Sequence, residues 1–189
     1  LSIGMVLLAH DRMAERLERL ANQDELTGAL TRRAFLAQAG ALLEAARGAG
    51  QRVTLAIVDI DHFKSINDRY GHAAGDRVLA QFGRIVKGGV RASDVFGRLG
   101  GEEFALFFVD VAREEAVARL DELRVLALSV RCSADASTFE PEEGGHGGLT
   151  FSAGVDELRE EDTLAALMAR ADTALYVAKA RGRDRVVAA

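Results

Sequence analysis

The sequence FGRLGGEEFALFF, residues 96–108, contains two apolar runs separated by two glycines and two glutamates. Aromatic and aliphatic residues on both sides favour β-strands. Gly-Gly between two strands favours a tight hairpin, because the common two-residue turns need positive φ. Glu102 and Glu103 are then expected at the start of a core strand. Adjacent carboxylates are costly there unless a positive group meets them, so the hairpin predicts a nearby cation.

Another acidic position ends the apolar run RVTLAIVDID, residues 52–61. Both alternating faces of this run are mostly apolar, which is typical of a central strand. If this strand neighbours the hairpin, Asp59 meets Glu102 and Glu103 at one edge of the sheet. Such acids favour Mg²⁺, which takes oxygen ligands and leaves positions open for substrate phosphates. The alternative is that each carboxylate caps a turn or pairs with Arg98.

Basic side chains indicate phosphate binding near these acids. The N–H groups of His62 and Phe63 begin a short predicted helix, where anions are favoured, and Lys64 follows them. Lys179 and Arg183, four residues apart, lie on or just beyond one face of the last predicted helix. Basic residues near a helix C-terminus also interact favourably with its dipole, so a structural role for them stays open.

An amide in the short helical segment and a carboxylate after it are candidates for base recognition. Asn67 and Asp76 have the groups needed to hydrogen-bond a purine edge, the carboxylate accepting from the N1–H and N2–H₂ donors of guanine. The alternative is local: Asn67 ends one helix, and Asp76 caps the start of the next.

The order of elements predicts an α+β fold with a mostly antiparallel central sheet flanked by helices. Apolar periodicity predicts helices over residues 32–47, 75–89, 113–126 and 162–183, and a short helix with a turn over 62–72. Strands are expected over 52–61, in the 95–108 hairpin, over 125–134, over 149–155, and at an edge over 184–188. Glycines and the one proline predict a loop over 135–148.

Composition fits one globular domain with a short appendage. The chain has 189 residues, 49% hydrophobic and 28% charged. Its net charge of −5 argues against binding of duplex nucleic acid, which normally needs a basic face. The single cysteine, Cys132, excludes an internal disulfide, fits a reducing cytoplasmic setting, and is expected to be a buried structural thiol.

Residues 1–21 are expected to form an N-terminal signalling helix ahead of a domain over 22–189. Apolar positions at steps of three and four over residues 6–20 indicate either a short coiled-coil stalk or an ordinary amphipathic helix. Residues 1–9 are apolar but shorter than the roughly 20 residues that span a bilayer. They are either the end of a membrane helix, which would tether the protein, or the start of an apolar-faced helix. Because the sequence begins with Leu, we expect a longer protein.

Four motifs resemble the GGDEF family of diguanylate cyclases, occur in the family's order and cover nearly all of residues 22–187. They are DELTGALTRR (24–33), DIDHFKSINDRYGHAAGD (59–76), GGEEF (100–104) and ADTALYVAKARGRDRV (171–186). The resemblance implies a fold similar to nucleotidyl cyclase and polymerase palm domains. It also implies condensation of two GTP to cyclic di-GMP and pyrophosphate, with Mg²⁺ or Mn²⁺, in a two-fold homodimer.

The resemblance assigns roles to individual residues. Asp59, the carbonyl of Ile60, and Glu102 match the metal ligands, and Glu103 matches a second acid that binds metal or accepts a proton. The residues that match substrate contacts are Phe63, Lys64, Lys179 and Arg183 for phosphates, Asn67 and Asp76 for guanine, and Gly100 and Gly101 for close approach to the backbone.

RASD, residues 91–94, matches the RxxD motif at which cyclic di-GMP inhibits enzymes of this family. Arg91 would grip phosphate or guanine with two donors, and the alternative is an exposed ion pair between Arg91 and Asp94. Ungapped counting puts Glu122 where a second arginine is frequent, with Arg119 and Arg124 on either side, so that partner stays open.

Departures from the family pattern are few. Glu102 replaces an aspartate but keeps the carboxylate, whereas Ala29 and Thr31 replace a leucine and an asparagine and loosen the expected packing near the guanine. Two other functions stay open: a non-catalytic receptor for GTP or cyclic di-GMP, and a cyclase that acts on another nucleotide.

Overall fold

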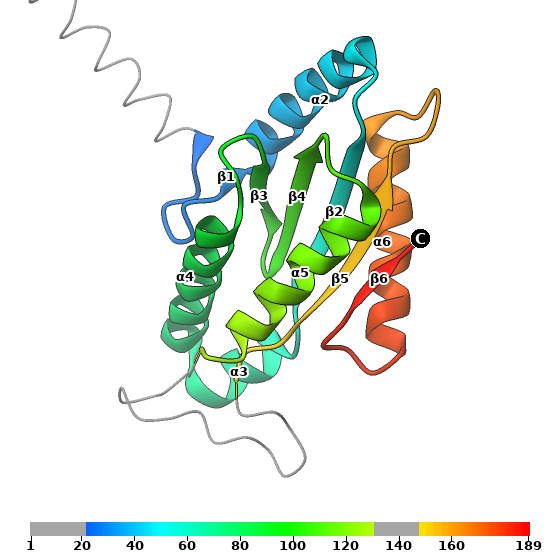
Figure 1. Cartoon of the computed structure of the whole chain (residues 1–189). Coiled ribbons are helices and arrows are strands. Elements are labelled where there is room, and N and C mark those ends of the chain that lie inside the picture. The colour runs from blue at the N-terminus through cyan, green and yellow to red at the C-terminus, as the bar shows by residue number, and fades with distance from the viewer. Residues whose placement is uncertain (1–21, 131–147) are drawn as a thin grey trace, which may run out of the picture.

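The computed structural model describes residues 22–130 and 148–189. The expected helix over residues 6–20, Cys132 and nearly all of the expected loop over 135–148 lie outside these ranges. One mixed sheet has the strand order β1-β3-β4-β2-β5-β6. The strands are β1 (Leu30–Thr31), β2 (Val53–Ile60), β3 (Val95–Gly100), β4 (Glu103–Val109), β5 (Phe151–Glu157) and β6 (Val186–Ala188). The helices are α2 (Arg32–Ala49), α3 (Phe63–Tyr70), α4 (His72–Gly89), α5 (Arg113–Ala127) and α6 (Leu164–Ala180), arranged around the sheet in Figure 1.

Strand β2 forms the centre of the sheet, as its two apolar faces predict. All eight of its residues are buried, and it pairs antiparallel with β4 on one side and β5 on the other. The β3–β4 hairpin is also antiparallel, whereas β1 and β6 pair parallel with their neighbours at the two edges. The predicted α+β fold with a mostly antiparallel sheet is therefore confirmed.

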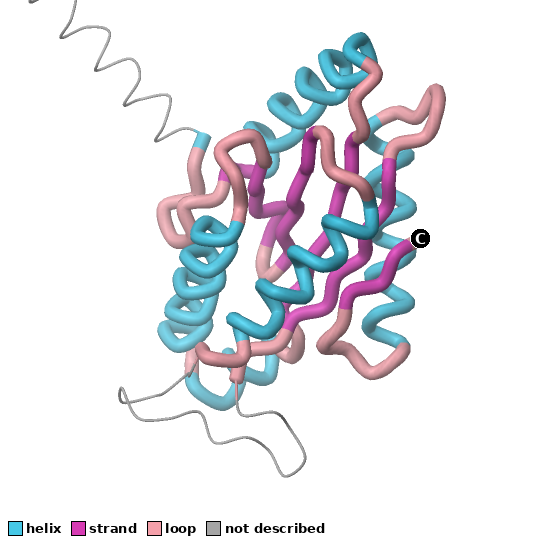
Figure 2. The backbone as a smooth tube through the Cα atoms, viewed as in Figure 1, coloured by secondary structure: helices cyan, strands magenta, loops and turns pink. Residues whose placement is uncertain are grey.

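Helices cover both faces of the sheet, which Figure 2 shows as strands between two groups of helices. One core lies between the sheet and α3, α4 and α5, and contains Phe82, Phe104 and Phe151. The other lies between the sheet and α2 and α6, and contains Phe35 and Phe107. Side chains alternate between these cores along β2, because successive residues of a strand point to opposite faces.

The hairpin contains a turn one residue later than the sequence predicts. Gly100 ends β3 opposite Glu103, so that Gly101 and Glu102 form the turn and only Glu103 begins the core strand. Gly101, the first residue of the turn, has φ +51°, a left-handed conformation that suits glycine, and Gly100, directly before the turn, has φ +155°. Glu102 therefore lies in the turn, directly before the first residue of β4, and not within the strand.

The strand predicted over 125–134 is wrong within the described residues. Helix α5 continues to Ala127 and ends in a turn. Leu123 and Ala127, four residues apart, are buried, whereas Val125 and Leu126 are 60% and 53% exposed. A spacing of four residues between buried side chains is typical of a helix with one buried face. The sequence did not reveal this helical period, because two residues of the continuous apolar run, Val125 and Leu126, face outward.

Helix α6 lies very close to β5, and Gly154 permits that approach. A Cβ at Gly154 would lie 2.0 Å from the carbonyl oxygen of Ala171 and 2.1 Å from the backbone nitrogen of Leu175. Both are backbone atoms that cannot rotate away. The missing side chain therefore sets the distance at which α6 packs on the sheet.

We expect Gly154→Ala to lower the free energy of unfolding by about 1–3 kcal/mol, because the methyl group would force helix and sheet apart. Urea denaturation measures the change. Gly48→Ala is the control: Gly48 lies in α2 with open space where a Cβ would point, so this variant should gain about 0.5–1 kcal/mol. Equal stability of Gly154→Ala and the wild type would contradict the close packing.

Candidate active site

The three predicted acids meet at the end of the central strand. Asp59 of β2 lies directly opposite Glu103 of β4. The N–H of Ile60 donates to the carbonyl of Glu102 at 3.3 Å, which holds the hairpin turn beside the strand end. The sheet register therefore brings carboxylates that lie more than 40 residues apart in sequence to one edge.

The positive partner of this acidic edge is Lys179. Its ammonium nitrogen lies 2.8 Å from an Asp59 carboxylate oxygen, reaching it from the last turn of α6. Asp59 is 8% exposed. Burial raises the pKa of Asp59, and the charges of Glu102 and Glu103 add to this effect; the ion pair with Lys179 lowers the pKa but does not cancel the increase. A negative charge at Asp59 is thus stabilised only in part by protein groups.

These residues fit a divalent cation that binds together with a nucleotide. Within residues 22–130 and 148–189, no three His, Cys, Asp or Glu side chains form a ready-made metal site. Mg²⁺ typically binds through one or two carboxylates and substrate phosphates, without an all-protein cage. Asp59 provides a carboxylate with incomplete neutralisation, and Glu102 and Glu103 lie close enough to raise its pKa. The cation that lies next to Asp59 in this structure is the ammonium of Lys179.

Arg98 does not pair with Glu102 or Glu103 in the ion pairs of the described residues, so the predicted alternative that these carboxylates pair with Arg98 is wrong. One of its nitrogens donates to both carboxylate oxygens of Asp24, at 3.0 and 3.1 Å. The other two donate to the carbonyl of Gly101, at 2.8 and 2.9 Å. Arg98 thus ties the hairpin turn to the N-terminal end of the domain.

Asp24 is also the acceptor within its own turn. It accepts from the backbone N–H and the hydroxyl of Thr27, at 2.9 and 2.6 Å. Burial opposes ionisation, but these hydrogen bonds and the Arg98 guanidinium outweigh it and hold the pKa of Asp24 below its ordinary value. Sequence reasoning missed this network. An aspartate three residues before a threonine is a turn signal, but nothing in sequence links it to an arginine 74 residues away.

The predicted phosphate contacts lie at the same end of the sheet. Helix α3 begins at Phe63, directly after the turn that follows β2. The Phe63 side chain is buried in the core, so only its backbone N–H is available to an anion. Lys64 and Arg183 are exposed, and Arg183 has φ +62° in the turn after α6.

The predicted guanine contacts come together where α3 meets α4. A Cβ at Gly75 would lie only 2.0 Å from the side-chain oxygen of Asn67. The absence of a side chain at Gly75 thus lets the Asn67 amide lie against the first turns of α4. Asp76 is the next residue and is exposed. The local alternative for Asp76 is wrong, because α4 begins at His72 and Gly71 is its cap.

Comparison with known proteins identifies the family. A model of the family described as "Diguanylate cyclase, GGDEF domain" matches residues 21–185. This chain belongs to the GGDEF family of diguanylate cyclases. Diguanylate cyclase VdcA of Vibrio cholerae is 38% identical over 190 residues, covering 98% of this chain and 53% of that protein. The response regulator PleD of Caulobacter vibrioides is 39% identical over 170 residues, covering 89% and 36%. The chain thus spans about half, or less, of these relatives.

Solved structures of the GGDEF family have the same fold. The coiled coil and GGDEF domain of DgcB from Caulobacter crescentus, in complex with c-di-GMP, superposes with a TM-score of 0.86 at 32% identity, over 99% of this chain and 97% of that chain. The active GGEEF domain of a diguanylate cyclase from Vibrio cholerae gives 0.73 at 31%, over 84% and 96%. Within the described residues, no helix has the length and apolar character that crossing a membrane requires.

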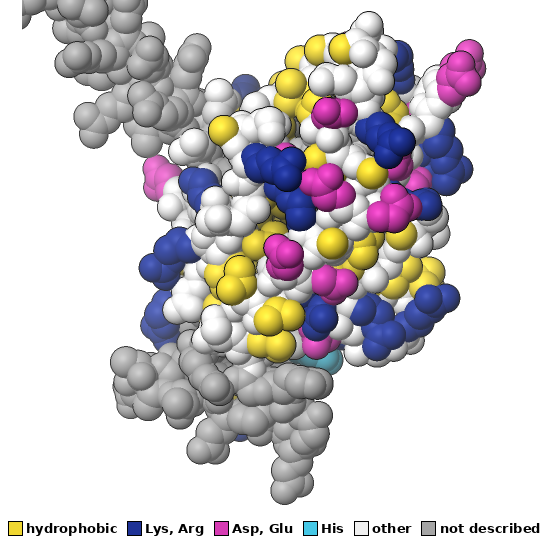
Figure 3. All heavy atoms as spheres, viewed as in Figure 1, with side chains coloured by type: hydrophobic (Ala, Val, Ile, Leu, Met, Phe, Trp, Pro, Cys, Tyr) yellow, Lys and Arg dark blue, Asp and Glu magenta, His cyan; other side chains and the backbone are white. Residues whose placement is uncertain are grey.

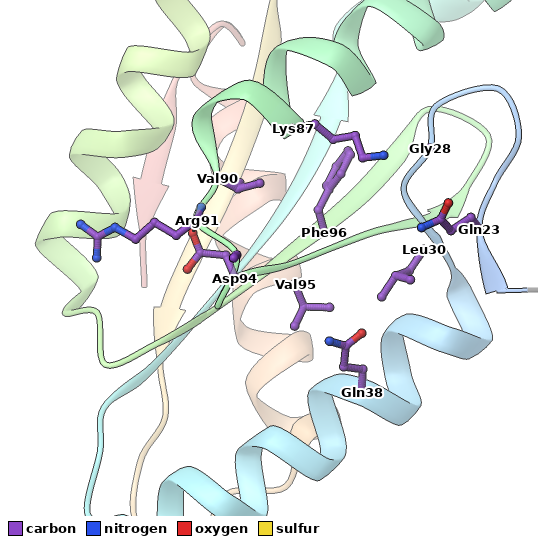
Figure 4. Close-up of a pocket in the computed structure, with 11 residues that line it drawn as sticks. Gln23, Gly28, Leu30, Gln38, Lys87, Val90, Arg91, Asp94, Val95 and Phe96 are labelled. Atoms are coloured by element: carbon purple, nitrogen blue, oxygen red, sulfur yellow. Dashed lines mark hydrogen bonds between the residues drawn. The ribbon is translucent and has the colours of Figure 1, made fainter. Parts of the chain in front are cut away.

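The RxxD motif of this GGDEF domain is held by partners on α5. The alternative for this motif, an exposed ion pair between the Arg91 and Asp94 side chains, is absent from the ion pairs of the described residues; the Arg91 guanidinium pairs with Glu115 at 3.1 Å. Asp94 instead accepts from the backbone N–H of Arg91 at 2.7 Å and from the guanidinium of Arg119. Arg91 is among the residues that line the neighbouring pocket of about 320 Å³, and Figure 4 shows its guanidinium directed away from the other labelled residues.

Of the two arginines that flank Glu122 in sequence, Arg119 is the one that contacts the motif, through Asp94. Arg124 pairs instead with Asp121 and Asp184, each at 3.0 Å. Acidic and basic side chains are interspersed over the α5 face in Figure 3, consistent with these local pairs. The pocket beside the motif contains none of the residues predicted to contact GTP.

We expect the stabilising role of Asp24 to depend on pH. A carboxylate whose pKa is lowered by folding contributes stability above its unfolded pKa of about 4, and this is lost as pH falls through the lower folded value. Asp24→Asn should therefore destabilise the domain at pH 7, and the difference from the wild type should shrink below pH 4. Urea denaturation at several pH values measures this.

Glu25→Gln removes an exposed carboxylate one residue away and controls for the change in net charge. A difference between Asp24→Asn and the wild type that stays constant from pH 7 to pH 3 would show that the charge of Asp24 is not what stabilises the turn.

Proposed function

We propose that this domain condenses two molecules of GTP into cyclic di-GMP and pyrophosphate. The observation that carries the proposal is the ion pair of the buried Asp59 carboxylate with Lys179, next to Glu102 and Glu103 at one edge of the sheet. The relatives named as diguanylate cyclases and the neighbours in complex with c-di-GMP support it.

The protein groups divide the nucleotide between them. The backbone N–H at Phe63, with Lys64 and Arg183, binds the β- and γ-phosphates, because a helix N-terminus and basic side chains favour anions. Asn67 and Asp76 hydrogen-bond the guanine edge. Gly100 and Gly101 leave room for the nucleotide above the turn, where no neighbouring atom would meet a Cβ at either position.

Asp59, the carbonyl of Ile60, and Glu102 would hold Mg²⁺ or Mn²⁺. The chemistry that such an ion supplies is charge neutralisation on the α-phosphate and activation of the 3′-hydroxyl. Lys179 exchanges its ion pair with Asp59 for one with a nucleotide phosphate. Glu103 is a further metal ligand or the acceptor of the hydroxyl proton. In each of two steps a 3′-oxygen bonds to an α-phosphorus, the bond to the α,β-bridging oxygen breaks, and pyrophosphate leaves.

Two copies of the domain are required. The site binds one GTP, and cyclic di-GMP needs two that attack each other in opposite directions, which a two-fold axis provides. We propose that residues 22–189 form the catalytic domain and that residues 1–21 form a helix that controls this encounter. Arg91 and Asp94 would bind the product and inhibit the enzyme, with Arg119 as their neighbour on α5.

Asp59→Asn should lower cyclic di-GMP synthesis by at least about a hundredfold, the loss typical of removing one group that stabilises a transition state.

The free energy of unfolding should also differ between Asp59→Asn and the wild type, and the difference should depend on pH. A carboxyl whose pKa is raised by folding destabilises the native state as pH rises from about 4 to the folded value. In EDTA, the wild type should therefore lose stability relative to Asp59→Asn over this range.

Chromatography of the nucleotides measures synthesis, and urea denaturation measures stability. Asp110→Asn, an exposed aspartate beyond the far end of β4, is the matched control and should make product. Synthesis by Asp59→Asn at the wild-type rate would refute the assignment. A wild-type protein that binds GTP but makes no product under any condition would indicate a receptor.

Product inhibition should respond to both partners of the Arg91–Glu115 ion pair. Arg91→Ala should raise the inhibition constant for cyclic di-GMP by about tenfold or more, the effect of losing a charged hydrogen-bonding group. Glu115→Gln should lower it by about two- to fivefold, because an exposed ion pair that competes with the ligand is weak. Initial rates at increasing cyclic di-GMP give both constants. Unchanged inhibition in Arg91→Ala would exclude the RxxD site.

A further inference from the structure

Asp61 carries a second buried carboxylate at the end of β2, two residues beyond Asp59, and is 4% exposed. One of its oxygens accepts from the hydroxyl of Ser152 on β5 at 2.7 Å. The other accepts from the backbone N–H of Asp184 at 3.0 Å. None of the described basic side chains forms an ion pair with Asp61. Both oxygens are thus used by protein donors, and a buried carboxylate without these bonds would be costly.

The Asp184 bond joins β2 to the turn that connects α6 and β6, at the end of the sheet where α3 lies (Figure 1). Arg183 has φ +62° and Asp184 has φ +44° in this turn. Left-handed backbone is unfavourable for residues with a Cβ and persists where the surroundings hold it in place. The Asp61 carboxylate is one of the groups that hold it.

Other contacts fix the same turn from different sides. The Asp184 carboxylate pairs with Arg124 of α5 at 3.0 Å. The carbonyl of Arg185 accepts from the backbone N–H of Ala153 at 2.9 Å. Of these contacts, only the one from Asp61 comes from the segment that directly continues β2, the strand that carries Asp59.

The Arg183 guanidinium is exposed and forms no ion pair or hydrogen bond with the described residues. Its position relative to Asp59 depends on the turn that carries it. Lys179, by contrast, is held by the body of α6. If Arg183 and Asp59 are to bind the same nucleotide, the turn that carries Arg183 must be held at a fixed position relative to β2.

We infer that Asp61 is a positioning residue: its hydrogen bond to the Asp184 N–H fixes the turn so that Arg183 meets the β- and γ-phosphates of a GTP held at Asp59. The inference rests on the proposed function, because it takes Arg183 as a phosphate contact. This role needs no contact between Asp61 and nucleotide or metal, since both of its oxygens accept hydrogen bonds from protein donors.

The test compares two nucleotides in calorimetric titrations with Mg²⁺. One is a GTP analogue with a CH₂ group in place of the α,β-bridging oxygen, which cannot be cleaved, and the other is GMP, which lacks the β- and γ-phosphates. Asp61→Ala should weaken binding of the GTP analogue by about tenfold, the effect of a lost hydrogen bond to a charged group. Binding of GMP should not change.

A double-mutant cycle separates positioning from a general structural effect. Asp61→Ala combined with Arg183→Ala should bind the GTP analogue no more weakly than Arg183→Ala alone. Asp61→Asn keeps one acceptor for Asp184 and presents an amide to the Ser152 hydroxyl, so it should recover most of the affinity. In turnover, Asp61→Ala should raise KM far more than it lowers kcat.

Thr54→Val is the matched control for stability. Thr54 is buried at the opposite end of β2, and its hydroxyl donates to the carbonyl of Val111 at 2.7 Å. Thr54→Val should lower the free energy of unfolding as Asp61→Ala does. It should not, however, weaken binding of the GTP analogue more than binding of GMP.

Two results would overturn the inference alone: equal weakening of GTP-analogue and GMP binding by Asp61→Ala, or additive effects in the cycle. If Arg183→Ala binds the GTP analogue as the wild type does, the proposed phosphate role of Arg183 fails, and the inference fails with it.

Discussion

A buried carboxylate at Asp59, opposed by a single ammonium group, is the constraint on which the rest of this structure depends. Taking this charge from water is unfavourable, and two neighbouring glutamates increase the cost. Lys179 compensates in part. An incompletely neutralised buried carboxylate is unfavourable for stability, and such conflicts are typical of functional sites. The function proposed for this site is to bind a cation together with a polyphosphate.

Packing around Asp59 makes this arrangement rigid. The strand that carries it is buried on both faces and bonded on both edges. Helix α6 reaches the strand end because Gly154 lets it approach β5. Arg98 fixes the hairpin turn, and Asp61 fixes the turn after α6. Acids, lysine and turns are therefore held by separate backbone elements that meet at one edge of the sheet.

Much of this could be predicted from sequence, and the failures have physical causes. Local patterns sufficed for β2, for the hairpin and for the amphipathic helices, because period and turn chemistry are local. The apolar run after Leu123 misled, because its outward-facing members hide the helical period. The pairs Asp24–Arg98, Asp94–Arg119 and Asp61–Asp184 were beyond reach, since they join residues that only the tertiary fold brings together. The roles of the site residues remain predictions that rest on family resemblance.

The most direct test of the central claim is product analysis as a function of protein concentration. The purified chain is incubated with GTP and Mg²⁺ over a wide range of protein concentration, and the nucleotides are separated by chromatography. We predict cyclic di-GMP, formed at a rate per protomer that rises with protein concentration, because two sites must meet. Absence of cyclic di-GMP from a chain that binds GTP, even when a dimeric coiled coil is fused to its N-terminus, would contradict the account.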